Sequence, residues 1–241
     1  MAEGGQDSAF EFMKTLLETG IDDCWPAFTN LIADIKTKDG EVIWWKKYKS
    51  RNSHAEIQML NDVEFKDEIG KVKDDKTKKV DIILTLNYSP CSECADKLKK
   101  FYEDNKSLIQ KFTIRFSGLY PGAGEAEGER GAATRPEDLA ELNVQENKDG
   151  LKDLDRAGIT LEAMTPESWF DVLMTDKSWL ESMSTDQKSS FETIMKKKDK
   201  FDRVMKLFGL NHDRVKKRDA DTSEGLKKLI MEEVVEKTKS L

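Results

Sequence analysis

The chain has 241 residues, of which 37% are hydrophobic and 36% are charged, and its formal net charge is −7. This composition is polar for a globular protein but lies above the range of disordered chains, and the negative charge argues against a strongly cationic nucleic-acid binder. Three cysteines are too few for a disulfide framework, no stretch is apolar enough to cross a membrane, and no signal peptide is visible, so we expect a cytoplasmic or nuclear protein.

Hydrophobic spacing and turn residues predict five segments in the first third of the chain. In chain order they are a helix over 8–19, strands over 28–35 and 41–48, a helix over 54–64 and a polar connector over 66–79. The two strands form a hairpin, because Lys38-Asp39-Gly40 between them is a turn signal. Ser53 is expected to be the N-cap of the helix that follows.

The rest of the chain alternates strands with helices around one long loop that is rich in Gly, Ala and Glu. The order is strand 80–86, helix 90–104, strand 111–117, loop 121–148, helix 149–157, strand 159–164, helix 166–183 and helices to 241. Strands and helices that alternate after a hairpin predict a three-layer α/β fold. Ligands of such a sheet lie at the carboxyl ends of its strands, where the next helices begin.

Two short segments at such strand-to-helix junctions carry the chemistry. The first is His54-Ala55-Glu56 and the second, after a gap of 33 residues, is Pro90-Cys91-Ser92-Glu93-Cys94. One imidazole and two thiolates are the three protein ligands of an open catalytic zinc site, whose fourth position is left for water. Glu56 can move the proton of that water without binding the metal. H-x-E followed by P-C-x-x-C is the sequence signature of the zinc-dependent nucleobase deaminases.

The cysteine pair alone is a weak signal, because C-x-x-C also occurs in redox sites and in structural zinc sites. A redox site would leave His54 and Glu56 unrelated to the cysteines. A structural zinc site needs a fourth ligand nearby, and the remaining candidates, Cys24 and His212, do not have paired spacing. We therefore favour the catalytic interpretation.

Three segments resemble the AID/APOBEC polynucleotide cytidine deaminases. Residues 87–94 are similar to the S-W-S-P-C-x-x-C segment of that family, with Tyr88 in place of tryptophan. Residues 116–120 are similar to its F-x-A-R-L-Y segment, with Gly118 in place of arginine. Residues 150–170 are similar to its G-L-x-x-L-x-x-A-G-x-x-V-x-x-M-T-x-x-E-F segment.

The resemblance covers about residues 8–180 and implies a cytidine deaminase-like fold, with a five-stranded mixed sheet flanked by helices. It divides the chain into a zinc deaminase domain over 8–183, which contains the long acidic loop 121–148, and a helical C-terminal extension over 184–241. It implies zinc-dependent hydrolytic deamination of cytosine to uracil, with Zn²⁺ as the cofactor and single-stranded DNA or RNA as the partner.

The resemblance also implies which residues contact the flipped base. Tyr88 is expected to stack on it, Ser89 and the backbone of Ala55 to contact it, and Tyr120 to line the same pocket. Asn52 is the nearest match to an asparagine that precedes the zinc helix in the family. Core packing is the alternative role for the two tyrosines.

The charge pattern leaves the substrate open. In the family the loop after the tyrosine at position 120 is short and aromatic, whereas here residues 121–150 form a long acidic segment with a net charge of −5. We expect this segment to repel a nucleic-acid strand or to regulate access to the site. The basic segment 46–51 either meets phosphates or forms a solvated strand edge. A free cytidine or deoxycytidine deaminase, a tRNA adenosine deaminase and a catalytically silent, zinc-stabilised interaction module remain as alternatives, and the oligomeric state is open.

Overall fold

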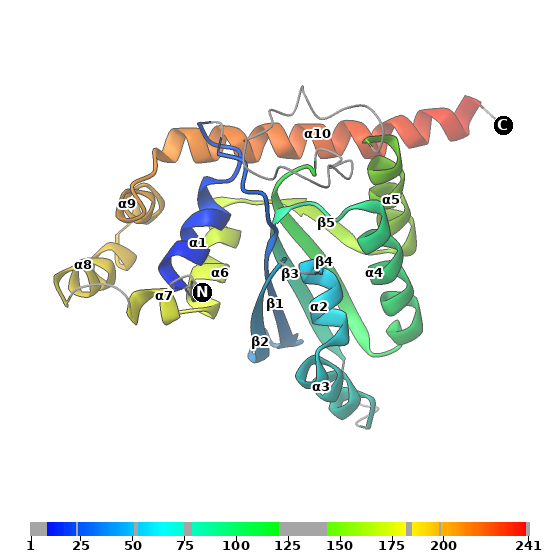
Figure 1. The fold of residues 1–241 in the computed structure, drawn as a ribbon, viewed down its shortest axis with the longest axis horizontal. Coiled ribbons are helices and arrows are strands. Elements are labelled where there is room, and N and C mark those ends of the chain that lie inside the picture. Colours follow the sequence, from blue (N-terminus) through cyan, green and yellow to red (C-terminus); the bar gives the residue numbers. More distant parts are fainter. Residues whose placement is uncertain are drawn as a thin grey trace, which may run out of the picture.

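The centre of the molecule is a five-stranded mixed sheet (Figure 1). The computed structural model describes residues 9–22, 24–50, 53–74, 79–120, 144–181, 185–197 and 199–239. The strands are β1 (Asn30–Thr37), β2 (Val42–Lys49), β3 (Val80–Tyr88), β4 (Ile109–Gly118) and β5 (Thr160–Ala163), in the order β2-β1-β3-β4-β5. The pairs β2–β1 and β1–β3 are antiparallel, whereas β3–β4 and β4–β5 are parallel. The prediction of an α/β fold with a five-stranded mixed sheet is confirmed.

Helices cover both faces of this sheet, so the fold has three layers. They are α1 (Ala9–Glu18), α2 (Ala55–Asn61), α3 (Val63–Asp74), α4 (Ser92–Asn105), α5 (Val144–Ala157), α6 (Pro166–Thr175), α7 (Ser178–Glu181), α8 (Thr185–Met195), α9 (Lys200–Leu207) and α10 (His212–Lys239). Figure 1 shows α2–α5 on one side of the sheet and α1 with α6–α9 on the other.

Alternating side chains of the strands divide the interior into two cores, because successive residues of a strand point to opposite faces. On β1, Leu31, Ala33 and Ile35 pack with α2–α5, whereas Ile32 packs with the buried side chains of α1, α6 and α9. Burial on both faces explains why the central strand β3 is mainly apolar.

The long helix α10 crosses from one layer to the other along an edge of the sheet (Figure 1). Val215, near its start, belongs to the core on the α1 side, and Leu226 and Leu229, further along, belong to the core on the α2–α5 side. Between them the hydroxyl of Thr222 donates a hydrogen bond of 2.9 Å to the backbone carbonyl of Ser117, near the end of β4. The helix α10 therefore lies against the edge at which the parallel strands end.

A buried arginine fastens α10 to the first helix. Nη1 of Arg218 donates to the carbonyl oxygens of Leu17, at 3.0 Å, and of Thr19, at the end of α1. Its Nε donates to Asp219, whose second carboxylate oxygen accepts from Nε1 of Trp169 in α6 at 2.9 Å. Helix C-termini leave carbonyl groups without helical partners, and this arginine satisfies two of them.

Three sequence predictions around the second helix are wrong. The helix over 54–64 is interrupted at Asp62, whose backbone is extended, and the connector over 66–79 is mostly the helix α3. One carboxylate oxygen of Asp62 accepts hydrogen bonds from the backbone N–H groups of Glu64 and Phe65 and so starts the new helix. Ser53 is not the N-cap, because His54 occupies the N-cap position and makes no side-chain hydrogen bond to the helix.

Two other boundaries also differ. Helix α5 begins at Val144, so residues 144–148 are helical instead of belonging to the predicted loop, whose remainder lies outside the described residues. The predicted helix over 166–183 ends at Thr175, because the extended residue Asp176 interrupts it and its carboxylate accepts the backbone N–H of Ser178.

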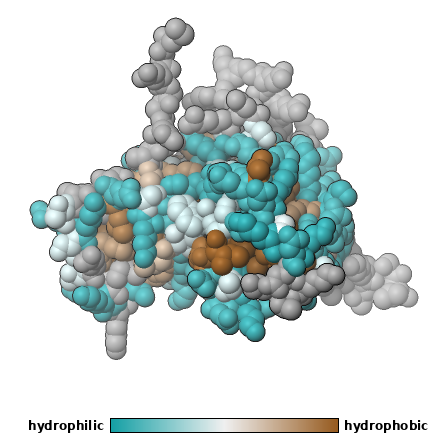
Figure 2. Space-filling view, turned by 90° about the horizontal axis from the view of Figure 1, so that it is seen from below, coloured by the Kyte–Doolittle hydropathy of each residue, from teal (hydrophilic) through white to brown (hydrophobic). Residues whose placement is uncertain are grey.

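The surface of the described chain is mainly polar. The face seen from below in Figure 2 is mostly hydrophilic, and hydrophobic residues gather there only in small areas. Among the described residues, no helix combines the length and the apolar content needed to cross a lipid bilayer.

Candidate active site

Four chain segments meet at one edge of the sheet, which we call the site edge. It is formed by the C-terminal ends of β2, β3 and β4 together with the start of β1, as the strand register requires. Helix α2 begins just beyond the end of β2, and α4 begins just beyond the end of β3. His54 and Cys91 are the residues that immediately precede these two helices. The expected positions at strand-to-helix junctions therefore bring distant segments to one place.

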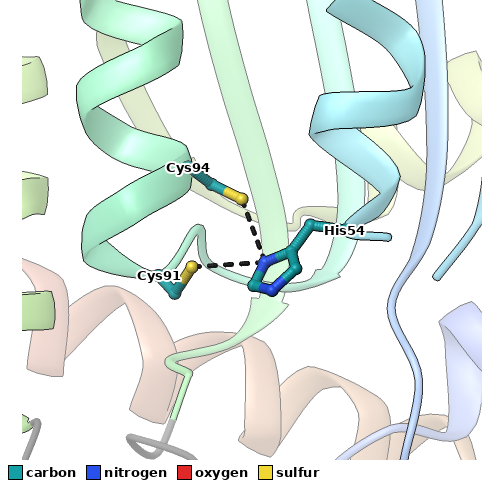
Figure 3. Close-up of side chains that lie close together, drawn as sticks. All are labelled: His54, Cys91 and Cys94. Atoms are coloured by element: carbon teal, nitrogen blue, oxygen red, sulfur yellow. Dashed lines mark hydrogen bonds between the residues drawn. The ribbon is translucent and has the colours of Figure 1, made fainter. Parts of the chain in front are cut away.

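His54, Cys91 and Cys94 point toward one another from the N-terminal ends of α2 and α4 (Figure 3). Nδ1 of His54 lies 3.2 Å from Sγ of Cys94 and 3.4 Å from Sγ of Cys91. The three potential ligand atoms all lie within 4.8 Å of one another. One imidazole nitrogen and two sulfur atoms are a donor set that zinc prefers, and three protein ligands leave a further coordination position open.

The two neighbouring thiols affect each other's ionisation. A hydrogen bond from the Cys94 thiol, assisted by the nearby imidazole, lowers the pKa of Cys91 to about 6. The same hydrogen bond and burial raise the pKa of Cys94. A second thiolate at this distance is unfavourable without a cation between the sulfur atoms, because the two negative charges repel each other in a buried place. The charge balance of the cluster therefore fits a bound divalent metal.

Glu56 lies in the first turn of α2, beside the cluster. It is only 3% exposed, and its carboxylate is a hydrogen-bond partner of the Cys94 thiol. Burial raises the pKa of Glu56 to about 7. A carboxyl group with a pKa near neutral can both accept and release a proton under physiological conditions. Glu56 is thus placed next to the ligand atoms without being needed as a ligand.

Helix α5 supports the first turn of α4, a contact that the sequence did not predict. The backbone N–H of Ser92 donates a hydrogen bond of 2.8 Å to Oδ1 of the buried Asn147. Cys91 makes no side-chain cap of its own, so Asn147 satisfies an N–H group that the helix start leaves free. Gly150, one turn further along α5, allows the close approach: a Cβ there would lie 3.0 Å from Cβ of Ala95 and 3.1 Å from Cα of Ser92.

Three of the predicted base-contacting residues lie together at the site edge. The buried Tyr88 donates its hydroxyl to the carbonyl of Pro26 at 2.8 Å, and its ring meets the half-buried Tyr120 edge-on at 5.9 Å. Oγ of Ser89 accepts the backbone N–H of Tyr120 at 2.8 Å. Ala55 is fully buried at the start of α2, next to His54, whereas Asn52 lies outside the described residues. Contact of these residues with a base remains a prediction.

Sequence reasoning missed an aromatic residue at the same edge. Trp25 stacks on Tyr88 with a centroid distance of 6.2 Å and an interplanar angle of 16°. Its segment leads into β1, and β1 starts beside the end of β3 because the two strands are antiparallel. The predicted hairpin does not contain this signal, because it pairs β1 with β2, whereas Trp25 reaches Tyr88 through the pairing of β1 with β3.

The described lysines of the basic segment 46–51 have partners within the protein. Lys46 pairs with Asp62 and Lys47 with Asp176, each at 2.9 Å. Nζ of Lys49 lies 3.5 Å from the ring centroid of Phe28. Both alternatives for this segment, a phosphate contact and a solvated strand edge, remain predictions.

Comparison with known proteins agrees with this arrangement. A family model described as the invertebrate AID/APOBEC deaminase matches residues 12–207, which include the three potential ligands and Glu56. A search of curated proteins finds no match. The match covers most of the chain and the fold has the expected mixed sheet. The chain therefore belongs to the invertebrate AID/APOBEC deaminase family.

Proposed function

We propose that this protein is a zinc-dependent deaminase that converts cytosine to uracil in single-stranded DNA or RNA. The observation that carries the proposal is the convergence of His54, Cys91 and Cys94, from two helices, beside the buried carboxyl group of Glu56. The family match supports the same chemistry. Neither a redox pair nor a structural zinc site requires a buried carboxyl group at that place.

The site residues have separate roles in this reaction. His54, Cys91 and Cys94 would hold Zn²⁺, which when bound supplies a Lewis acid that makes water nucleophilic near neutral pH. Glu56 accepts a proton as water adds to C4 of cytosine, and it delivers a proton to the departing amine. The C4–N4 bond breaks, the oxygen of water becomes the new carbonyl oxygen, and ammonia leaves. The buried position of Glu56 limits competing exchange of its proton with solvent.

The choice of a polynucleotide over a free nucleoside rests on the family and on the aromatic residues of the site edge. Trp25 and Tyr120 are half-buried next to Tyr88, and aromatic side chains hold single strands by stacking on bases. The net charge of −7 is the observation that favours a free nucleoside instead. We expect the protein in the cytoplasm or the nucleus, where thiols stay reduced.

The test is deamination of an oligonucleotide with a single cytosine, read by uracil excision. Single-stranded DNA, single-stranded RNA and free cytidine are compared at equal protein concentration. Turnover of a strand supports the proposal and identifies the nucleic acid, whereas turnover of free cytidine alone would move the protein to nucleoside metabolism. Turnover of adenosine in tRNA would instead identify the protein as a tRNA adenosine deaminase.

Two variants separate catalysis from metal binding. Glu56→Gln keeps the shape of the side chain and is expected to keep one zinc per chain while losing at least about a hundredfold in rate, the usual contribution of a general acid–base group. Cys91→Ala is expected to lose the zinc. Unchanged activity of Glu56→Gln would remove Glu56 from the mechanism, and unchanged zinc content of Cys91→Ala would show that the ligand set is wrong.

A further inference from the structure

The peptide bond between Cys91 and Ser92 joins a potential zinc ligand to the first residue of α4. The N–H group of this peptide bond donates a hydrogen bond of 2.8 Å to Oδ1 of Asn147, which comes from α5. A peptide unit is planar, so a partner that fixes the direction of its N–H also fixes the plane in which Cα of Cys91 lies. Asn147 therefore restrains the backbone from which the Cys91 side chain projects.

Asn147 is itself held firmly in place. The residue is only 5% exposed, and Gly150, one turn further along α5, brings the two helices so close that an added Cβ would lie 3.1 Å from Cα of Ser92. Leu151 and Leu154 of α5 are buried in the core that α5 shares with α4. Because the two helices are packed closely at this point, the acceptor has a fixed position relative to the donor.

Only the oxygen of the Asn147 side chain has a partner in the part of the chain that the structure describes. The Nδ2 group is buried and makes no hydrogen bond there. A buried donor without a partner costs free energy, so the amide nitrogen is a disadvantage at this position. Aspartate keeps the oxygen in a side chain of the same shape and lacks the unused donor. An aspartate variant therefore separates the role of the acceptor from the role of the whole amide.

The other ligand helix supplies a contact of this kind from its own sequence. Nε2 of Gln58 in α2 donates to the carbonyl oxygens of Lys49 at 2.9 Å and of Ser53 at 2.8 Å, and the second carbonyl belongs to the peptide bond with His54. The N-cap residue of α4, Cys91, makes no side-chain cap hydrogen bond. The side-chain support of this helix start thus comes from a different element, α5.

We infer that Asn147 is a positioning residue of the zinc site, which holds the N–H of Ser92 and thereby directs the Cys91 sulfur toward the metal. The inference rests on the proposed function, because it takes Cys91 to be a zinc ligand. Without the hydrogen bond this peptide unit is freer to turn, and the metal has to order it on binding. Partners that orient metal ligands through hydrogen bonds account for a factor of about 10–100 in metal affinity or activity. Asn147 acts through a backbone group, so we expect the lower end of this range.

The test measures zinc affinity by competition with a chelator, so that no turnover is needed. Full-length, zinc-loaded parent is compared with Asn147→Ala and Asn147→Asp. We expect Asn147→Ala to bind zinc about tenfold more weakly. Asn147→Asp is expected to stay close to the parent affinity, because a carboxylate oxygen accepts the same N–H.

Cobalt(II) in place of zinc gives a second readout, because the visible absorption of this ion depends on the geometry and the sulfur ligands around it. The spectrum of Asn147→Ala is expected to differ from that of the parent, and Asn147→Asp is expected to restore it. A loss of stability alone would leave the spectrum of the folded, loaded protein unchanged. Thermal unfolding of each variant checks that the fold is intact.

Asn211→Ala is the matched control. Oδ1 of Asn211 accepts the backbone N–H groups of Asp213, at 2.9 Å, and of Arg214 at the start of α10, a helix that carries none of the three potential ligands. This variant is expected to lower the melting temperature and to keep the zinc affinity and the cobalt spectrum of the parent. Equal losses of zinc affinity in Asn211→Ala and Asn147→Ala would overturn the inference. Parent affinity and spectrum in Asn147→Ala, or no recovery in Asn147→Asp, would overturn it as well.

These outcomes are distinguishable from failure of the proposed function. A parent that holds neither zinc nor cobalt would refute the metal site of the proposed function, and the inference with it. A parent that holds the metal but releases no uracil would refute the deamination alone, and the affinities of the Asn147 variants would still decide the inference. A parent that deaminates strands while Asn147→Ala keeps its zinc affinity would refute the inference and leave the proposed function standing.

Discussion

The contact between α5 and the zinc-ligand helix α4 predicts that the same substitution has opposite effects in two helices. Gly150 lies inside α5 and Gly70 lies inside α3. In either helix alanine is favoured over glycine by about 1 kcal/mol, because glycine loses more backbone entropy on folding. A Cβ at Gly70 meets nothing within 4 Å, whereas at Gly150 it lies 3.0 Å from Cβ of Ala95 and 3.1 Å from Cα of Ser92.

The magnitude follows from these distances. Gly70→Ala is expected to raise the free energy of unfolding by about 1 kcal/mol, which raises the melting temperature by about 2–4 °C for a protein of this size. Gly150→Ala gains the same helix propensity but must push α4 away by a few tenths of an ångström, and overpacking of this kind costs about 1–3 kcal/mol. The net change at Gly150 is a loss of about 0–2 kcal/mol, so the two variants differ by about 1–3 kcal/mol.

The displaced atom is Cα of Ser92, the residue after Cys91, so the strain also reaches the ligands. The assay is chemical unfolding of the two variants and the parent, together with a competitive titration of zinc against a chelator. We expect Gly150→Ala to be less stable than Gly70→Ala and to hold zinc more weakly, while Gly70→Ala keeps the zinc affinity of the parent. Equal stabilisation by both substitutions would refute the close packing of α4 on α5.

Three further predictions follow. Asn147→Ala removes the acceptor for the Ser92 N–H and is expected to cost about 1 kcal/mol of unfolding free energy, whereas Gln145→Ala on the exposed face of α5 costs less than about half of that. Burial raises the pKa of Asp34 from 3.8 to about 6, so its folded form binds the extra proton and stability falls as the pH rises through this window. Asp34→Asn removes this loss, and its advantage over the parent in urea unfolding should grow by about 2 kcal/mol between pH 4 and pH 6; a constant difference would contradict the burial of an ionisable group. Removal of zinc by a chelator should lower the melting temperature by about 10 °C where the zinc had been a thousandfold above its dissociation constant, and Cys91→Ser should show no such shift.

Local patterns in the sequence were enough to predict the hairpin, the three-layer α/β fold and the three potential ligands, whereas the five-stranded mixed sheet was predicted from the family resemblance. These features depend on residue type and spacing, such as the apolar stretch that became β3 and the C-x-x-C at the start of α4. The helix α3 was missed because its lysines and acids hide three buried side chains, Phe65, Ile69 and Val72, which recur at helical spacing. Counting apolar residues at every third or fourth position predicts this helix, whereas the average polarity of the segment does not.

Contacts between distant segments were beyond the reach of the sequence patterns. Asn147 supports α4 across 55 positions of the chain, and its type and neighbours give no sign of this. Trp25 stacks on Tyr88 because β1 pairs with β3, a pairing outside the predicted hairpin, and no local signal points the ring toward the site. Arg218 of α10 becomes a neighbour of Trp25 and Gly118 only through the path of that helix across the sheet.

The hydrogen bonds from Arg218 to the end of α1 join residues that are synthesised at very different times. Arg218 follows its acceptor Leu17 by 201 residues, so this hydrogen bond can form only after almost the whole chain has been synthesised. Chains grow at about 5–20 residues per second, so this interval is on the order of ten to forty seconds. When Arg218 is made, the nascent chain already contains His54, Cys91 and Cys94. The three potential metal ligands are therefore made before the residue that fastens α10 to the first helix.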